Sequence, residues 1–250
     1  MKKVQGLFEK PSAREKYVQQ FDQDPHDLAL WKKAFENAIF DSITVPLPYS
    51  EAGTFSPGSF PVYSYNFELA PGERLEALVA TDSLPSLVFL DLYQQQNDSL
   101  VSYDHLKSAE FESGSLRYEA EEAGIYKLIV QPEISASRPF RIHLKKVPVY
   151  TFPVAGKGNA NVQSFWGATR DGGRRSHEGI DIFAARGTPV IAAVDGRISS
   201  TGNKGLGGKQ VWLRDRKRGN SLYYAHLDSI IATPGMNVVA GDTLGLVGNT

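Results

Sequence analysis

The sequence contains no cysteine among its 250 residues. This absence excludes a cysteine-ligated metal site, a thiol nucleophile and a disulfide framework, so any metal ion must be held by His, Asp, Glu or Asn. An excess of charge of either sign is also lacking, because 27 Lys and Arg oppose 28 Asp and Glu for a formal net charge of −1. That balance argues against duplex nucleic acid or an anionic membrane surface as an electrostatic partner.

Long hydrophobic runs are missing as well. Nowhere do about 18 apolar residues follow one another, so the sequence predicts no membrane span. The first residues begin with two lysines, as a signal peptide does, but Gln5, Glu9 and Lys10 interrupt any apolar stretch and no small-residue cleavage site follows. No signal peptide is visible, so either the protein stays inside the cell or its export signal is missing from the printed chain.

The length and the periodicity of apolar residues together predict two domains preceded by a helical segment. Within residues 1–44, apolar side chains recur near helical spacing on both sides of Asp24-Pro25. Two helices are therefore expected, with Asp24 capping the second and Pro25 at its first position. The apolar stripe of this helix should pack on a later part of the chain.

A mainly β architecture is expected for the rest of the chain. Residues 45–147 predict an antiparallel β-sandwich of jelly-roll type, because short alternating runs are separated by turn residues such as Pro71-Gly72 and Asn97-Asp98-Ser99. The expected strands are Val62 to Leu69, Leu75 to Thr81, Leu87 to Tyr93, Gly124 to Val130 and Phe140 to Lys146. Residues 148–250 are rich in glycine, with short strands expected at Pro189 to Ala193, Gln210 to Arg214 and Leu222 to Ala225.

The sharpest local feature is His177, followed four positions later by Asp181. Both residue types are competent zinc ligands. A His-Glu-x-x-His helix site is rejected, because glycines surround the pair and the second residue is an aspartate. In a straight strand the two Cα atoms would lie roughly 13 Å apart, too far for bonds of about 2 Å to one ion. We therefore expect the backbone to bend, with Gly179 permitting the bend.

This pair lies within a longer series of short motifs. In order they are Phe165-Trp166-Gly167, Arg170-Asp171-Gly172-Gly173-Arg174-Arg175, His177-Glu178-Gly179-Ile180-Asp181-Ile182, Gly187-Thr188-Pro189-Val190, Ala192-Ala193-Val194-Asp195-Gly196, Lys204-Gly205-Leu206-Gly207-Gly208, Tyr223-Tyr224-Ala225-His226-Leu227 and Gly241-Asp242-Thr243-Leu244-Gly245-Leu246-Val247-Gly248-Asn249-Thr250. In order and spacing the series resembles the lysostaphin-like, or LytM-like, zinc endopeptidases, which cut peptides of bacterial peptidoglycan. The resemblance implies a barrel-sandwich fold, the duplicated hybrid motif, for residues 148–250.

The resemblance also implies roles for three residues. His177 and Asp181 match the first two zinc ligands of the family, and His226 matches a catalytic histidine beside the metal-bound water. The resemblance implies Zn²⁺ as the cofactor and a peptidoglycan peptide as the substrate. It also implies that the protein acts outside the cytoplasm, in the periplasm or at the cell surface. Without its motif, the interpretation of His226 as a structural histidine on a strand edge is slightly favoured. The resemblance says nothing of oligomeric state.

One departure from the family pattern bears on activity. The family takes its third zinc ligand and a second active-site histidine from a His-x-His motif that follows the Gly-x-x-Gly segment, whereas the printed sequence ends at Thr250. A catalytic zinc normally has three protein ligands and a water. We therefore expect residues 148–250 to be a C-terminally incomplete peptidase domain with little or no activity.

Other functions remain as alternatives to a peptidase. The main one is a non-catalytic domain of the same fold that binds cell wall or regulates other wall hydrolases. A phosphate-binding loop, a serine hydrolase and a lipoyl-type carrier each lack a required residue near Gly205, Ser221 or Thr233. Two sets of side chains have open roles. The first set could bind an anionic substrate group or lie in a solvated loop, and consists of Arg170, Arg174 and Arg175. The second set is expected in packing or at the surface, and consists of His26, His105 and His143.

Overall fold

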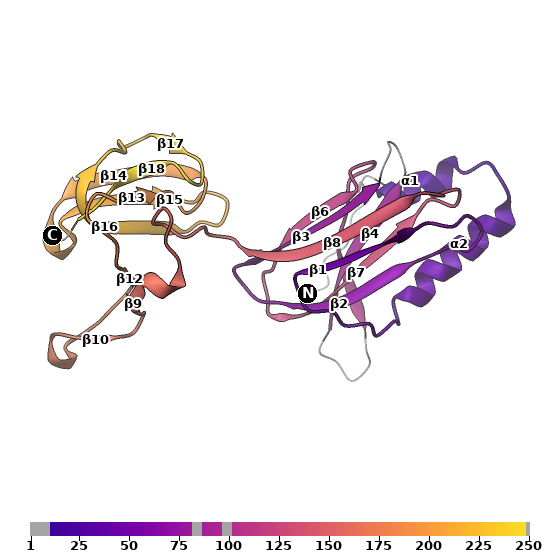
Figure 1. The fold of residues 1–250 in the computed structure, drawn as a ribbon, viewed down its shortest axis with the longest axis horizontal. Helices are drawn as coiled ribbons and strands as arrows, with labels where there is room; N and C mark the ends of the chain where they lie inside the picture. The colour runs from indigo at the N-terminus through magenta and orange to yellow at the C-terminus, as the bar shows by residue number, and fades with distance from the viewer. Residues whose placement is uncertain (1–10, 82–86, 97–101, 249–250) are drawn as a thin grey trace, which may run out of the picture. The chain divides into compact units, whose positions relative to one another are not determined.

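The computed structural model describes residues 11–81, 87–96 and 102–248, and the chain divides into two compact units, Met1–Val149 and Tyr150–Thr250 (Figure 1). The basic N-terminus and the turn expected at Asn97-Asp98-Ser99 lie outside the described residues. No helix in the described ranges combines the length and apolar character needed to cross a bilayer.

Two helices open the first unit, as predicted. Helix α1 (Ala13–Gln20) begins with a capping box, in which the Ser12 hydroxyl accepts from the Glu15 amide and the Glu15 carboxylate accepts from the Ser12 amide. Helix α2 (Pro25–Ala38) begins with the Asp24 carboxylate accepting from the His26 amide and with Pro25 at the first helical position. Local sequence chemistry thus sets both starts.

A sandwich of two four-stranded antiparallel sheets follows. Its strands are β1 (Tyr49–Thr54), β2 (Tyr63–Leu69), β3 (Glu73–Thr81), β4 (Val88–Gln95), β5 (Tyr103–Ser108), β6 (Ser115–Glu119), β7 (Gly124–Pro132) and β8 (Pro139–Pro148). One sheet has the order β1-β8-β3-β6 and the other β2-β7-β4-β5. The five predicted strands are present, and the predicted sandwich is confirmed. Strands β1, β5 and β6 were not predicted, because these edge strands carry few apolar residues.

The helices cover the outer face of the β2-β7-β4-β5 sheet (Figure 1). Polar groups of that face bind the helical segment directly: Trp31 Nε1 donates to the Pro132 carbonyl, Gln131 Nε2 to the Trp31 carbonyl and Lys127 Nζ to the Asp41 carbonyl. Strand β7 is therefore buried on both faces over most of its length, which removes the alternation expected of a half-exposed strand.

An arginine from α1 is the main charged link between helix and sheet. The Arg14 side chain is only 13% exposed, and its Nη2 lies 2.7 Å from Asp91 Oδ2. Its Nη1 donates to Gln131 Oε1, and its guanidinium carbon lies 3.8 Å from the centroid of the Phe35 ring. Burial lowers the pKa of Arg14, while the attraction of Asp91 opposes that shift.

The second unit is β-rich. Its strands are β9 (Val162–Ser164), β10 (Thr169–Arg170), β11 (Arg175–Ser176), β12 (Asp181–Ile182), β13 (Pro189–Ile191), β14 (Gly196–Asn203), β15 (Lys209–Arg214), β16 (Ser221–Ile230), β17 (Asn237–Val238) and β18 (Thr243–Val247), with short 3₁₀ turns at Asn159–Asn161, Asp171–Gly173 and Gly205–Gly207. Six of these form one antiparallel sheet in the order β13-β18-β16-β15-β14-β17 around a second apolar core. The three strands predicted here are present, and the predicted mainly β fold class is confirmed.

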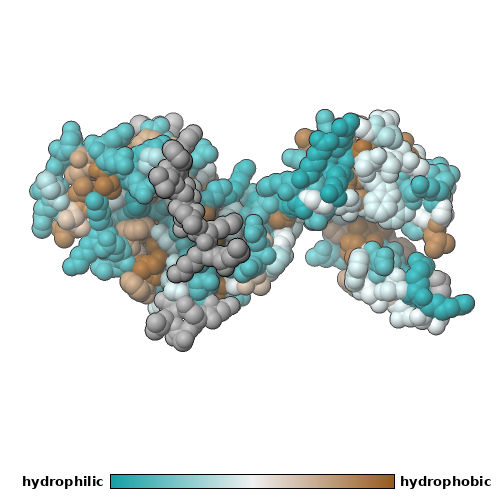
Figure 2. Space-filling model, turned by 180° about the vertical axis from the view of Figure 1, so that it is seen from behind, coloured by the Kyte–Doolittle hydropathy of each residue, from teal (hydrophilic) through white to brown (hydrophobic). Residues whose placement is uncertain are grey.

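The remaining four short strands form two separate ribbons, β12-β9 and β10-β11. Figure 1 shows this segment, residues 162–182, projecting from the six-stranded sheet. It carries large apolar side chains that remain exposed, and Figure 2 shows brown apolar surface on this unit. These side chains are Phe165, Trp166 and Ile180.

We expect Arg14→Leu to lower the free energy of unfolding of the first unit by about 3–5 kcal/mol, because Asp91 would keep a buried charge without its partner. Chemical denaturation of the full chain measures the effect. The control Lys33→Leu removes an equal charge from an exposed position of α2, and should change stability by less than about 0.5 kcal/mol. Equal losses in the two variants would contradict a structural role for this ion pair.

Candidate functional site

Two backbone hydrogen bonds fix the loop that carries His177. The Gly167 amide donates to the His177 carbonyl and the His177 amide donates to the Ala168 carbonyl, each at 2.8 Å. Four residues later, Asp181 pairs with Ser164 across the β12-β9 ribbon. Both candidate ligands are thus tied to the same stretch of chain around residues 164–168. The bend expected between them is present.

The resulting distance suits two ligands of one metal ion. His177 Nε2 lies 3.3 Å from Asp181 Oδ1, and the side chains are 16% and 36% exposed. Two ligand atoms bound to one tetrahedral zinc at about 2.1 Å lie about 3.4 Å apart. A nitrogen–oxygen distance of 3.3 Å is longer than most direct hydrogen bonds. The distance fits two ligands of one zinc ion, and it also fits a long polar contact between the two side chains.

The other ring nitrogen of His177 is held by the chain. His177 Nδ1 lies 3.2 Å from the Phe165 carbonyl oxygen and 3.3 Å from Ser164 Oγ. A carbonyl only accepts hydrogen bonds, so this contact favours a proton on Nδ1 and a lone pair on Nε2. Histidines that bind metals are commonly oriented in this way by a second contact of the imidazole.

Arg170 holds the opposite side of the carboxylate. Its Nη2 donates to Asp181 Oδ2 and, at 2.7 Å, to Ser164 Oγ. Asp181 therefore directs Oδ2 to the arginine and Oδ1 to His177. Neither Arg170 nor Ser164 was predicted as a partner of this pair. Arg170 was one of three arginines with an open role, and nothing in the sequence marked Ser164.

Gly179 lies at the bend, as expected, and its φ does not lie in the left-handed region. An added Cβ would lie 3.7 Å from His177 Nε2, an ordinary contact distance. Glycine at this position keeps the space beside that nitrogen open.

His226 lies at an irregularity of β16. Val211 of β15 pairs with Tyr224, and Lys209 pairs with Leu227, so one residue of β15 faces two of β16. This is a β-bulge. His226 has φ 57°, a conformation that non-glycine residues rarely adopt, and its side chain is exposed. Strained backbone of this kind is concentrated at functional sites.

The structure does not bring all three predicted residues together. Among residues 11–81, 87–96 and 102–248, no three His, Asp or Glu side chains gather closely enough to hold one metal ion. His177 and Asp181 form a pair, and His226 is not part of a cluster with them. The donor set that the pair offers, one imidazole nitrogen and one carboxylate oxygen, suits zinc.

The remaining histidines take part in surface contacts or lie on the surface of the first unit. His105 Nε2 lies 3.0 Å from Ser108 Oγ, and His143 Nδ1 lies 2.8 Å from Ser50 Oγ. His26 lies exposed in the first turn of α2. In the second unit Arg174 is exposed on the turn that joins β10 to β11, and Arg175 is exposed at the start of β11.

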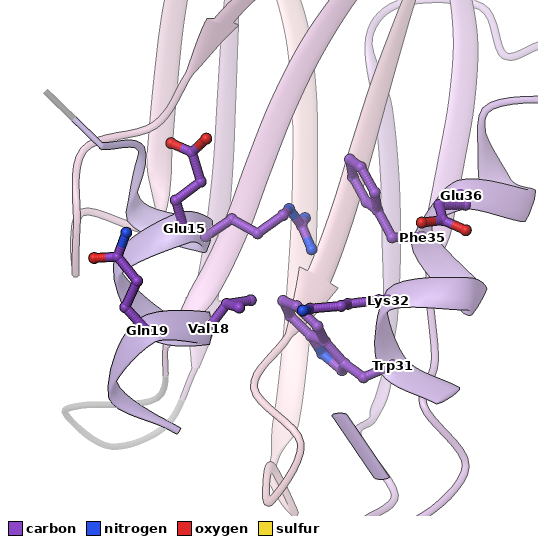
Figure 3. Close-up of a pocket in the computed structure, with 8 residues that line it drawn as sticks. Glu15, Val18, Gln19, Trp31, Lys32, Phe35 and Glu36 are labelled. Carbon is purple, nitrogen blue, oxygen red and sulfur yellow. The ribbon is translucent and has the colours of Figure 1, made fainter. Parts of the chain in front are cut away.

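A cavity of about 310 Å³ lies between α1 and α2, and no pattern in the sequence predicted it. Figure 3 shows side chains of the two helices converging on it, among them Val18, Trp31 and Phe35. Its lining includes the buried Arg14 but no histidine, serine or aspartate. The charged groups that line it are Arg14, Glu15, Lys32 and Glu36, and Arg14 is already bound to Asp91 and Gln131.

Comparison with known proteins concerns this same unit. Residues 175–250 match the family described as Peptidase family M23, and the match includes His177, Asp181 and His226. The DD-carboxypeptidase/endopeptidase Mpg of Neisseria meningitidis serogroup B is 43% identical over 76 residues, which cover 30% of this chain and 17% of that protein. The L-Ala--D-Glu endopeptidase of Bacillus subtilis is 35% identical over 104 residues, 40% of this chain and 32% of that protein.

These matches span less than a third of either relative's length. Among solved structures, a zinc-containing peptidase from Vibrio cholerae aligns with 96% of this chain and 89% of its own, at 14% identity and a TM-score of 0.35. A similarity this low carries no weight for fold or function, so the family relationship rests on the sequence of residues 175–250.

The left-handed φ of His226 leads to a prediction about stability. We expect His226→Gly to unfold with a free energy about 1 kcal/mol higher than His226→Ala, because only glycine adopts this conformation without steric cost. Chemical denaturation followed by near-ultraviolet circular dichroism measures the difference. At the neighbouring Ala225, φ is not positive, so Ala225→Gly should be less stable than the wild-type protein with alanine there. The same order of stabilities at both positions would show that His226 is not strained.

Proposed function

We propose, from the match of residues 175–250 to Peptidase family M23 and from their similarity to endopeptidases, that the chain carries a zinc metalloendopeptidase domain of the lysostaphin-like type that cleaves peptide bonds of bacterial peptidoglycan. The observation that most directly supports the proposal is the 3.3 Å approach of His177 Nε2 to Asp181 Oδ1. This function requires the C-terminal unit to act outside the cytoplasm, in the periplasm or at the cell surface.

Each side chain of the site has a separate role in this proposal. His177 Nε2 and Asp181 Oδ1 would hold Zn²⁺, with the Phe165 carbonyl fixing the imidazole and Arg170 fixing the carboxylate. When bound, zinc supplies Lewis acidity and an acidified water. The imidazole of His226 would orient that water or stabilise the negative charge that develops on the scissile carbonyl. Hydrolysis adds water across the peptide bond and yields a carboxylate and an amine.

We further propose that residues 1–250 hold zinc weakly and cleave slowly. Only two candidate ligand side chains meet in the described part of the chain, whereas a catalytic zinc usually has three protein ligands. A non-catalytic wall-binding or regulatory role is the second candidate function, and the same observation favours it. The two roles differ in whether peptide bonds are cleaved.

Zinc titration tests the ligand pair. We expect His177→Ala and Asp181→Ala each to weaken zinc binding by roughly 100-fold or more, because loss of a ligand should cost at least as much as loss of an outer contact. Calorimetry, or competition with a chromophoric chelator, measures the affinity. His26→Ala serves as the matched control, since it removes an exposed histidine of the first unit. Wild-type affinity in both site variants would exclude this pair as the zinc site.

Cleavage of purified peptidoglycan, followed by the appearance of new amino termini, tests the reaction. With excess zinc we expect new amino termini to appear slowly, and we expect their appearance to stop when a chelator is added. The rate should fall about 100-fold in His226→Ala, because a positioned acid–base group contributes at least that factor. If the chain sediments with peptidoglycan but no amino termini appear at any zinc concentration, the non-catalytic role is correct and the enzymatic proposal fails.

A further inference from the structure

An aromatic pair lies on the open face of the six-stranded sheet. Trp212 of β15 and Tyr223 of β16 are directly opposed across the two strands, and their ring centroids are 4.4 Å apart. Tyr223 is 45% exposed, while its neighbour Tyr224 is 7% exposed and faces the core. The two adjacent tyrosines therefore lie on opposite sides of the sheet. The pair has no partner in the apolar core.

The Tyr223 ring is held in place by its surroundings. Its hydroxyl donates to Oε1 of Gln210, a buried residue only 6% exposed, at 2.5 Å. Gly207 lies against the same hydroxyl, because a Cβ added there would come within 1.8 Å of the Tyr223 oxygen. A ring fixed in this way loses little conformational entropy when a ligand binds to it. The pair is therefore a preorganised surface.

The bulge places His226 on the same face as this pair. Val211, Tyr224 and Leu227 are buried and face the core. The residues between these positions therefore lie on the opposite face: Gln210 on β15, and Ala225 and His226 on β16. Trp212 and Tyr223 belong to that face by the same alternation. Tyr223 and His226 are three residues apart, or about 10 Å along a strand.

We infer that Trp212 and Tyr223 form a subsite that binds an aliphatic side chain of an extended peptide lying along β16, about three residues from the bond at His226. The inference rests on the proposed function, because it takes His226 to mark the scissile bond. An extended peptide advances about 3.3 Å per residue, so a side chain three residues away reaches the rings.

The chemistry of the rings favours a peptide side chain over a sugar. Two adjacent aromatic rings offer apolar area for an alkyl chain, and their electron-rich faces also accept an alkylammonium group. The Tyr223 hydroxyl proton is already committed to Gln210, so it is not available to a sugar hydroxyl. Leucine and lysine side chains share the aliphatic chain that the surface would recognise.

Peptide binding to the full chain, followed through the indole N–H resonance of Trp212, tests the inference without zinc or cleavage. The probes are acetylated, amidated pentapeptides with Gly, Leu or Lys at the centre and Gly elsewhere, and chitotetraose represents a glycan. We expect the Leu and Lys peptides to bind about threefold to tenfold more tightly than the Gly peptide. Comparison of Leu with Lys shows whether the ammonium group contributes.

The variants separate the aromatic surface from general effects. Tyr223→Phe should keep most of the preference for Leu over Gly, whereas Tyr223→Ala should abolish it. Ile231→Ala is the control, because it shortens an apolar side chain that is 52% exposed in the same unit, and it should leave the preference unchanged. Trp212→Phe assigns the resonance.

Three outcomes would overturn the inference: no preference for Leu or Lys over Gly, a preference that survives in Tyr223→Ala, or a stronger response to chitotetraose than to any peptide. These outcomes are independent of the proposed function. A chain that never cleaves peptidoglycan can still show the side-chain preference, and a chain that cleaves without the preference refutes only the aromatic subsite.

Discussion

The chemistry of the second unit depends on one constraint, the fold of the loop that brings an imidazole nitrogen and a carboxylate oxygen to 3.3 Å. The residues involved are four apart in sequence, but neither helix nor regular strand sets their distance. Backbone hydrogen bonds to residues 167 and 168 fix His177, and strand pairing with Ser164 fixes Asp181. Because both anchors belong to one short stretch of chain, the pair is a local property of residues 164–181.

Both units use an arginine to control a carboxylate, in different environments and with different consequences. Asp91 is 4% exposed and Arg14 holds it by two hydrogen bonds, so this pair ties a helix to a sheet. Asp181 lies nearer to solvent, and Arg170 binds only its Oδ2. An ion pair is costly to break when it is buried and worth less when it is solvated. The first pair therefore ties helix to sheet, whereas the second orients Asp181 so that its Oδ1 faces His177.

Much of the fold could be predicted because local rules decide it. The start of the second helix follows from Asp24 and Pro25, and runs of apolar residues mark the five predicted strands. The three missed strands of the sandwich lie at sheet edges, where burial leaves little pattern. The candidate ligands were found through a motif, but Arg170 and Ser164 were not, because their contacts depend on how two ribbons fold together. The aromatic surface escaped detection for the same reason, since Gly207, Gln210 and Tyr223 meet only after the strands pair.

The bulge in β16 has a consequence for how such a site can arise. A regular strand turns successive residues to opposite sides, so no exchange of one amino acid for another can turn two neighbours to the same side. The additional residue at Ala225–His226 does so, and it also restores Leu227 to the interior. Loss of either residue would invert every side chain from there to the end of the strand. A deletion at this position should therefore disrupt the strand more than a substitution. One additional residue, rather than a particular residue type, distinguishes this strand from a regular one.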